Sequence, residues 1–330
     1  MKNKKYYLLL DLGGTNANFI LYYTYKNQEI KKYNFKTKRI INFEILLSDL
    51  LFKIKSELNI DVDTAYFAVA GKLNKNRTKV KLTNYDLEID KDSIIKNTKI
   101  KKLILFNDME PIVEAIKIIS RKEIINIIKI KKKIETNKNY FSKNINNNYL
   151  IINIGTGLGV GIYNKNKVIS SELGHKLIDK KKTINPKLID YLENKLNKKI
   201  EYEDILSGRG IENINIYLKN KKTTAKSIFK SKKNRKEFEK VCTLFFDYLI
   251  EFIKIMNSEM KINNIYLSGG VIQNNILYSR KTLIEKTKKI KINLSILKNY
   301  SITIKGLIEF VKKKNKENLK KRSNFFSENN

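Results

Sequence analysis

The sequence has very few of the residues that cross-link or interrupt a fold. Among its 330 residues it has one cysteine (Cys242), one histidine (His175), two prolines and no tryptophan. A single cysteine excludes an internal disulfide framework, and one cysteine with one histidine excludes a structural zinc site built from several such ligands. Apolar runs such as Tyr6–Leu10 are far shorter than the roughly 20 residues that cross a bilayer. The basic start meets Asp11 too early for a secretory signal. We therefore expect a soluble, cytoplasmic protein with no membrane partner.

Acidic residues are also scarce, because 33 Asp and Glu stand against 68 Lys and Arg, a formal net charge of +35. A strongly basic chain suggests nucleic acid as a partner, since clustered cations release counterions from phosphates. The excess is nearly all lysine, however, and arginine is the residue preferred for bidentate contacts to phosphates and base edges. Lysine, asparagine and isoleucine recur together along the whole chain, which indicates a global compositional bias. We expect no specific nucleic-acid partner, although a nucleic-acid binder that uses the lysine surface stays an alternative.

The length and apolar content are sufficient for a folded protein of about two domains. Apolar residues make up 42% of the chain, which allows a sizeable core and excludes disorder throughout. Strand and helix patterns alternate in two blocks, and this predicts an α/β architecture. We expect a small α/β domain formed by residues 1–116 with 304–330, and a large α/β domain formed by residues 117–303.

Hydrophobic periodicity predicts the individual elements. Strands are expected at Tyr6–Leu10, Phe19–Tyr25, Ile30–Phe35, Thr64–Ala70, Lys102–Phe106, Tyr149–Ile154, Val160–Tyr163, Val168–Ser170 and Asn264–Ser268. Helices are expected at Phe43–Leu58, from Asp108 through Ser120, and at Pro186–Leu196, Gly210–Leu218, Glu237–Ile255 and Ile304–Val311. The segment Arg121–Asn148 is interpreted as a partly helical insertion or domain link, and the tail after Lys312 as a fraying end.

One pattern occurs twice, in Leu8–Asn16 and in Leu150–Leu158: an apolar strand, then Asp or Asn, then a Gly/Thr turn. A repeat of this kind predicts two related lobes, each with a tight hairpin. Glycines at a strand end let backbone N–H groups approach a phosphate. The two turns are therefore candidate phosphate sites, although ordinary hairpin chemistry is the alternative. Neither a P-loop nor a complete dinucleotide fingerprint is present. The candidate residues of the turns are Gly13, Gly14, Thr15, Asn16, Gly155, Thr156 and Gly157.

Three sets of polar residues are candidates for chemistry. Asp11, beside the first turn, suits a hydrated Mg²⁺, with an Asx turn as the alternative. Asn107 and Asp108 follow a strand, where a carboxylate can accept the proton of a hydroxyl nucleophile; the alternative is a helix N-cap. Glu172 and His175 can bind vicinal sugar hydroxyls, but a lone histidine is also common in a core. One of the nearby acids (Glu201, Glu203, Asp204) can close that site, or these acids serve a helix N-terminus.

Taken in order, these motifs resemble the bacterial glucokinase family. The matching segments are Asp11–Asn18, Ala70-Gly71, Leu82-Thr83-Asn84, Leu105–Asp108, Gly155–Gly159, Glu172–His175, Glu203–Gly208 and Leu267–Gly270. The resemblance implies a two-lobed actin/hexokinase-like (ribonuclease H-like) α/β fold with an interdomain cleft. It also implies ATP-dependent phosphorylation of glucose at the 6-hydroxyl to glucose 6-phosphate, the first step of glycolysis, by a homodimer.

The resemblance also assigns roles to residues. Asp108 would be the general base, and Asp11 would position Mg²⁺ through water. Glucose would be held by Asn84, Asn107, Asp108, Glu172, His175 and Glu203. ATP would be held by Asp11, Gly13, Gly14, Thr15, Asn16, Gly155, Thr156, Gly157, Gly269 and Gly270.

The sequence departs from the family pattern at several positions. Asn18 replaces an arginine, Leu173 a glycine and Arg209 a proline, and the C-terminal glycine segment is reduced to Thr303–Gly306. Tyr85–Glu88 lacks the usual tryptophan. These departures leave open the efficiency, the preferred hexose and the phosphoryl donor (ATP, ADP or polyphosphate). Two alternatives therefore remain: another hexose kinase of the related repressor/open-reading-frame/kinase group, or a degenerate sugar sensor without turnover.

Overall fold

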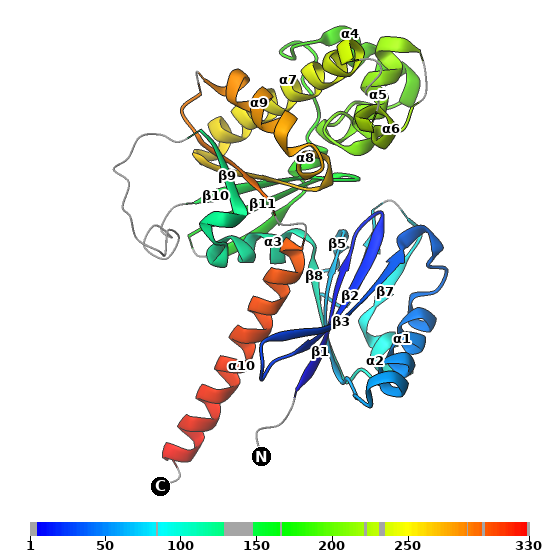
Figure 1. The fold of residues 1–330 in the computed structure, drawn as a ribbon, viewed down its shortest axis with the longest axis vertical. Coiled ribbons are helices and arrows are strands. Elements are labelled where there is room, and N and C mark those ends of the chain that lie inside the picture. The colour runs from blue at the N-terminus through cyan, green and yellow to red at the C-terminus, as the bar shows by residue number, and fades with distance from the viewer. Residues whose placement is uncertain are drawn as a thin grey trace. The chain divides into compact units, whose positions relative to one another are not determined.

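Two sheets with the same strand plan organise the chain, one in each of two compact units (Figure 1). One unit comprises Met1–Ile116 and Ser301–Asn330, and the other comprises Lys117–Tyr300. The structure is a computed structural model, and it describes residues 5–83, 85–128, 148–165, 167–220, 223–230, 235–288, 290–298 and 301–328.

The sheet of the first unit has the strand order β3-β2-β1-β4-β8. Its strands are β1 (Tyr6–Leu12), β2 (Asn16–Tyr23), β3 (Gln28–Lys36), β4 (Thr64–Val69) and β8 (Lys102–Asn107). Strands β1, β2 and β3 pair antiparallel, while β1, β4 and β8 are parallel. The carboxyl ends of β1, β4 and β8 therefore meet at one edge of the sheet, where ligand sites of α/β proteins lie.

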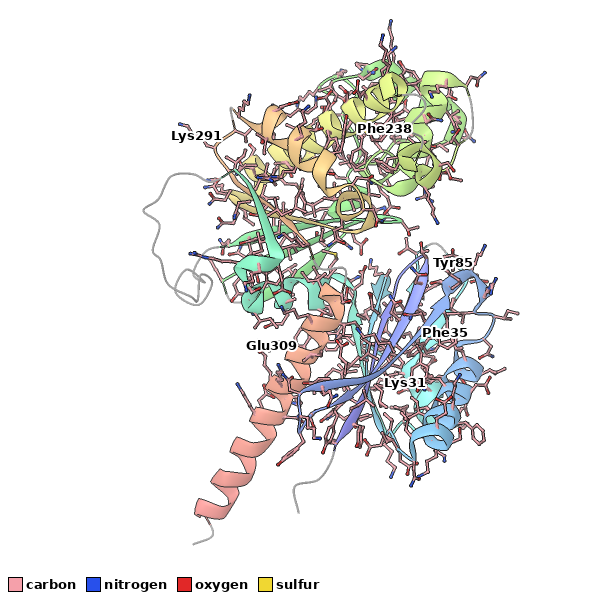
Figure 2. The ribbon with its side chains drawn as sticks, in the orientation of Figure 1. Lys31, Phe35, Tyr85, Phe238, Lys291 and Glu309 are labelled. Carbon is pink, nitrogen blue, oxygen red and sulfur yellow. The ribbon has the colours of Figure 1, made fainter. Side chains whose placement is uncertain are left out.

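Both faces of this sheet are covered, because side chains alternate between the faces of a strand. Leu8 and Leu10 pack with α1 (Phe43–Leu58) and α2 (Lys91–Asn97), whereas Tyr7 and Leu9 pack with α10 (Ile302–Glu328). Figure 1 shows α1 and α2 on one side of the sheet and α10 on the other. On the edge strand β3, Lys31, labelled in Figure 2, donates to Glu57 of α1 at 2.6 Å.

Two smaller elements of the first unit position the candidate site. Helix α3 (Met109–Ala115) packs against α10, and a three-stranded sheet is formed by β5 (Gly71–Leu73), β6 (Lys79–Leu82) and β7 (Glu88–Asp90). A Cβ at Gly306 of α10 would collide with the carbonyl of Pro111 in α3. The two helices therefore touch backbone to backbone at this point.

The sheet of the second unit has the order β12-β11-β10-β13-β14-β9. Its strands are β9 (Ile124–Ile128), β10 (Tyr149–Ile154), β11 (Leu158–Asn164), β12 (Lys167–Ser171), β13 (Asn264–Ser268) and β14 (Asn293–Leu297). Strands β12 to β14 repeat the order and directions of the first sheet. The duplicated plan agrees with the repeated strand-and-turn pattern of the sequence.

Helices gather on one side of this second sheet (Figure 1). They are α4 (Pro186–Leu196), α5 (Gly208–Lys219), α6 (Ala225–Lys230), α7 (Arg235–Met260), α8 (Gly270–Gln273) and α9 (Ile276–Thr287). The core between sheet and helices includes Ile152, Phe246 and Ile265. Phe238, labelled in Figure 2, makes an edge-to-face contact with Tyr278 of α9, with ring centres 4.9 Å apart.

Capping residues explain why two predicted helices have the predicted bounds. Helix α1 follows Asn42, whose side chain accepts from the Ile45 N–H, and it ends before Asn59 in the left-handed conformation. Helix α4 has an Asn cap before Pro186 at its first position and ends before the left-handed Asn197. Asparagine suits both positions, since its amide can cap a helix and it tolerates positive φ. The predictions of Phe43–Leu58 and Pro186–Leu196 are confirmed.

Three predictions differ from the structure by more than a few residues at an element's ends. The helix after Asp108 ends at Ala115 and continues only as a 3-10 turn over Ile116–Ile118. The segment expected as a partly helical link contains β9, an edge strand antiparallel to β14; residues 129–147 lie outside the described residues. Helix α10 continues to Glu328 instead of fraying after Lys312, because its lysines and glutamates favour helix and no proline interrupts them.

Within the described part of the chain, no helix combines the length and apolar character that crossing a membrane requires.

Candidate active site

The first glycine turn joins β1 to β2 and is fastened by Thr37. The Gly13 N–H donates to the Asn16 carbonyl at 3.0 Å and closes the turn. The Thr37 hydroxyl donates to the Gly13 carbonyl at 2.7 Å, and the Thr37 N–H donates to the Thr15 carbonyl at 3.1 Å. The predicted phosphate residues 13–16 therefore lie in one turn that three hydrogen bonds hold. Thr37 was not identified from the sequence, because only the pairing of β2 with β3 brings it here.

Asp11 lies beside this turn near the end of β1, and its environment is unusual for a carboxyl group. Burial raises its pKa to about 6, although side-chain hydrogen bonds with Asn18 and Thr303 act to lower it. Asn18 stands where the glucokinase pattern has arginine, and Thr303 belongs to the reduced C-terminal glycine segment. Two departures from the family pattern therefore contact the same carboxyl group.

Asn107 and Asp108 lie at the carboxyl edge of the same sheet, two strands from β1. Asn107, not Asp108, caps α3: its Oδ1 accepts from the Met109 N–H at 2.9 Å, and its Nδ2 donates to the Gly71 carbonyl at 3.0 Å. Asp108 occupies the N-cap position, but its side chain makes no capping hydrogen bond to the described backbone of α3. The alternative interpretation of Asp108 as a helix cap is therefore not supported.

The segments Ala70-Gly71 and Leu82-Thr83 are brought together by the small sheet. Gly71 pairs with Leu82, and the Thr83 N–H donates to the Ala70 carbonyl at 3.2 Å. A Cβ at Gly71 would collide with the carbonyl of Lys81, so only glycine fits. The predicted sugar residue Asn84 lies outside the described residues.

The second glycine turn, between β10 and β11, is joined to Glu203. Gly155 closes the turn by donating to the Gly157 carbonyl at 3.0 Å, and Gly155 accepts from the Gly208 N–H at 2.9 Å. Glu203 is 6% exposed, and its Oε2 accepts from the Leu158 N–H at 2.9 Å. A Cβ on Gly157 would lie 2.6 Å from this oxygen. Gly155, Gly157 and Glu203, which sequence analysis placed in separate motifs, therefore form one cluster.

Arg209 gives Glu203 a charged partner. Its Nη2 lies 3.0 Å from Glu203 Oε1, and its side chain is 52% exposed while that of Glu203 is nearly buried. Arg209 stands where the family pattern has proline, and a proline side chain has no cation to offer Glu203. Both oxygens of the candidate sugar-binding carboxylate are thus engaged within the second unit.

His175 lies next to the same cluster and is oriented by Glu201. Its Nδ1 lies 2.9 Å from Glu201 Oε2, and its Nε2 lies 3.8 Å from Glu172 Oε2. Burial acts to lower the pKa of His175, but the hydrogen bond to Glu201 and the charges of Glu203, Glu201 and Glu172 together raise it above its ordinary value. A Cβ at Gly174 would collide with the Leu158 carbonyl. The loop that carries His175 therefore lies directly against the start of β11.

The last predicted glycines, Gly269 and Gly270, connect β13 to α8. Gly269 has φ +93, and a Cβ there would collide with the backbone of Ile154 at the end of β10. The strand end that enters the second glycine turn therefore lies directly against this Gly-Gly turn. Thr156 belongs to the second glycine turn, between β10 and β11. The predicted residues of the second unit thus gather around the ends of β10 and β13.

Comparisons with known proteins identify the family of the chain. The Glucokinase family profile matches residues 8–282. A curated glucokinase of Colwellia psychrerythraea is 26% identical over 297 residues, covering 83% of this chain and 84% of that protein.

Solved structures show the same fold. The glucokinase of Balamuthia mandrillaris, in complex with glucose, superposes with a TM-score of 0.73 at 20% identity, covering 93% of each chain. A repressor/open-reading-frame/kinase (ROK) family glucokinase of Streptomyces griseus, in complex with glucose and AMPPNP, has a TM-score of 0.58 at 14% identity and covers 92% of this chain and 98% of that chain.

The chain therefore has the two-lobed actin- and hexokinase-like fold of sugar kinases. Within that class, it belongs to the glucokinase family.

Proposed function

We propose that this sugar kinase is a glucokinase that transfers the γ-phosphoryl group of ATP to the 6-hydroxyl of glucose, in the cytoplasm and as a first step of glycolysis. Asp108 accepts the proton of the 6-hydroxyl as its oxygen attacks the γ-phosphorus, and ADP leaves. The observation that carries this proposal is the position of Asp108. This residue is the N-cap of α3 at the carboxyl edge of the sheet, but the side chain that accepts from the first N–H of the helix, that of Met109, belongs to the neighbouring Asn107.

The substrate roles follow the family pattern and the clusters within each unit. Asn107, Asn84, Glu172, His175 and Glu203 hold the sugar hydroxyls. The two glycine turns hold the phosphates of ATP through backbone N–H groups, with the Gly269-Gly270 turn on the nucleoside side. Relatives solved with glucose and with AMPPNP support glucose and ATP as the substrates.

Magnesium is the metal expected with ATP. Among the described residues no group of three or more His, Cys, Asp or Glu side chains is placed to hold a metal. Kinase sites hold Mg²⁺ through one or two carboxylates together with phosphates and water. Asp11 fits this requirement as a water-mediated partner. When bound, the ion supplies charge neutralisation at the phosphates.

The test crosses a panel of hexoses (glucose, mannose, fructose) with ATP, ADP and polyphosphate, using the purified protein. ATP-dependent formation of glucose 6-phosphate is expected, with Asp108→Asn lowering kcat by about 10²–10⁴ while the KM for glucose changes little. The matched control is Asp90→Asn, because Asp90 caps α2 with its side chain and asparagine caps as well. Near-normal turnover of the Asp108 variant would contradict the assignment.

A non-catalytic sugar sensor is the second candidate, and the surroundings of Asp11 favour it. Asn18 in place of arginine removes a cation from the first phosphate motif, and burial raises the pKa of Asp11 to about 6. If the protein is such a sensor, calorimetry should detect glucose binding, and no phosphoryl donor should yield a phosphorylated sugar.

A further inference from the structure

Arg77 links the small sheet of the first unit to the segment that carries Asp108. It lies in the turn between β5 and β6, and its Nη2 donates to the Leu105 carbonyl at 2.8 Å. The same nitrogen lies 3.1 and 3.0 Å from the two carboxylate oxygens of Glu110. Its guanidinium carbon is 5.8 Å from the ring centre of Phe106. One side chain therefore contacts residues on both sides of the Asn107–Asp108 pair.

Glu110 extends this link to Asn107 and back to the small sheet. Its Oε1 accepts from the Asn107 N–H at 3.3 Å. The Asn107 side chain donates in turn to the carbonyl of Gly71, the first residue of β5. Arg77, Glu110, Asn107 and Gly71 thus form a closed circuit between one hairpin and the β8–α3 junction. Asp108 lies in the chain between Asn107 and Glu110, two members of this circuit, and its N–H donates to the Val69 carbonyl at 3.1 Å.

The backbone at Arg77 would suit a different residue. Arg77 has φ +55, in the left-handed region that favours glycine. The turn itself is closed by Asn74, whose Oδ1 accepts from the N–H groups of Thr78 and Lys79 at 2.8 and 3.1 Å. Glycine would fit this turn with less strain, so the conformation of the turn does not account for an arginine. The contacts of the side chain do.

We propose that Arg77 is a positioning residue for phosphoryl transfer, which holds the Leu105–Glu110 segment so that Asp108 meets the sugar hydroxyl in reacting geometry. This inference rests on the proposed function. Half-exposed ion pairs contribute little to stability, and the side chain of Arg77 is 46% exposed. A displacement of about 1 Å at reacting groups, however, can cost about 10²-fold in rate. The effect of Arg77 is therefore expected in kcat.

The test compares Arg77→Gly with Lys261→Gly, because Lys261, which follows α7, also has φ +55. Both changes relax a left-handed residue, but only the first removes the circuit. Arg77→Gly is expected to lower kcat about 10- to 100-fold, with an unchanged KM for ATP and no fall in melting temperature. Lys261→Gly should keep full kcat. Arg77→Lys should recover only part of the loss, because an ammonium lacks the planar fork and stacks poorly.

A double-mutant cycle tests the circuit itself. Glu110→Gln keeps an oxygen acceptor for the Asn107 N–H but removes the charge that faces Arg77. The effects of Arg77→Gly and Glu110→Gln on kcat should therefore be clearly less than additive. Additive effects, or a normal kcat in Arg77→Gly with only a lower melting temperature, would overturn the proposal.

Hydrogen exchange separates this inference from the proposed function. Peptides that span residues 105–110 should exchange faster in Arg77→Gly than in Lys261→Gly, whether or not the wild-type protein turns over. Unchanged exchange would overturn the positioning role. An inactive wild-type protein with the expected exchange difference would instead overturn the kinase assignment and leave the role of Arg77 in the structure intact.

Discussion

His175 Nδ1 lies 2.9 Å from Glu201 Oε2, and the chain contains no other histidine. This pair determines how the imidazole is presented. With Nδ1–H donating to the carboxylate, the neutral ring keeps Nε2 as an acceptor, and the protonated ring makes Nε2 a donor. Both forms are useful for a sugar hydroxyl, and their balance is controlled by the raised pKa of His175.

Glu201→Gln should lower the pKa of His175, because the amide keeps a hydrogen-bond acceptor but loses the negative charge. Because the pKa of His175 is higher in the folded state than its ordinary value of 6.5, protonation of His175 stabilises the fold. This stabilisation is complete at a pH below 6.5 and is lost as the pH rises through the folded-state pKa. The variant should therefore lose more stability at pH 6 than at pH 9. Proton NMR of tag-free protein reads the single histidine directly. Glu193→Gln on α4, where the carboxylate faces Lys180, should leave the titration of His175 unchanged; an equal pKa of His175 in both variants would contradict the pair.

The two glycines of the second turn should respond differently to alanine. A Cβ on Gly157 would lie 2.6 Å from Glu203 Oε2, whereas a Cβ on Gly155 would have no described atom within 4 Å apart from its chain neighbours. Gly157→Ala displaces the carboxylate from the Leu158 N–H, and loss of a charged hydrogen bond is worth about 1.5–3 kcal/mol. We expect glucose affinity to fall about 10-fold or more in Gly157→Ala and to change little in Gly155→Ala. Isothermal titration with glucose measures both, and equal affinities would contradict the prediction.

Asp11 should destabilise the folded protein at neutral pH. Its pKa is raised from 3.8 to about 6, so ionisation is less favourable in the folded state, and stability falls as the pH rises through this interval. Asp11→Asn should therefore unfold at higher urea than wild type at pH 8, with little difference at pH 4, and it should lose turnover with ATP. Asp61→Asn is a control of opposite sign, because the hydrogen bond to Lys55 lowers the pKa of Asp61. A lower urea midpoint of Asp11→Asn at pH 8 would contradict the buried-charge argument.

Gly306→Ala should loosen the contact between α10 and α3. A Cβ there would collide with the Pro111 carbonyl, and overpacking of this kind costs about 1–3 kcal/mol. Urea unfolding measures the loss. Gly13→Ala serves as a control because, apart from the chain neighbours of Gly13, the nearest described atom to its Cβ would be the Asn16 carbonyl oxygen at 3.9 Å. Equal stability of the two variants would show that the helices can separate without cost.

Local patterns in the sequence determined many of the elements and both glycine turns of this protein. Alternating apolar residues, asparagine caps and Gly-Gly-Thr turns act over a few residues, so the bounds of α1 and α4 and both hairpins could be predicted. The duplicated strand-and-turn pattern also predicted two related sheets. The residue types at Asp11, Asp108, Glu172 and His175 suggested candidate phosphate, base and sugar sites, and the order of the motifs along the chain carried the resemblance to the glucokinase family.

Only the tertiary structure decided which of these residues share a cluster. Strand β9 could not be predicted, since an edge strand depends on its partner β14. Thr303 contacts Asp11 from the far end of the chain, and Glu203 reaches the second glycine turn through the fold of the second unit. The positioning role proposed for Arg77 depends on a turn in which arginine takes the left-handed position, since its side chain then contacts Leu105 and Glu110. These contacts join residues distant in sequence, and their energies come from packing, burial and ion pairing that local patterns do not encode.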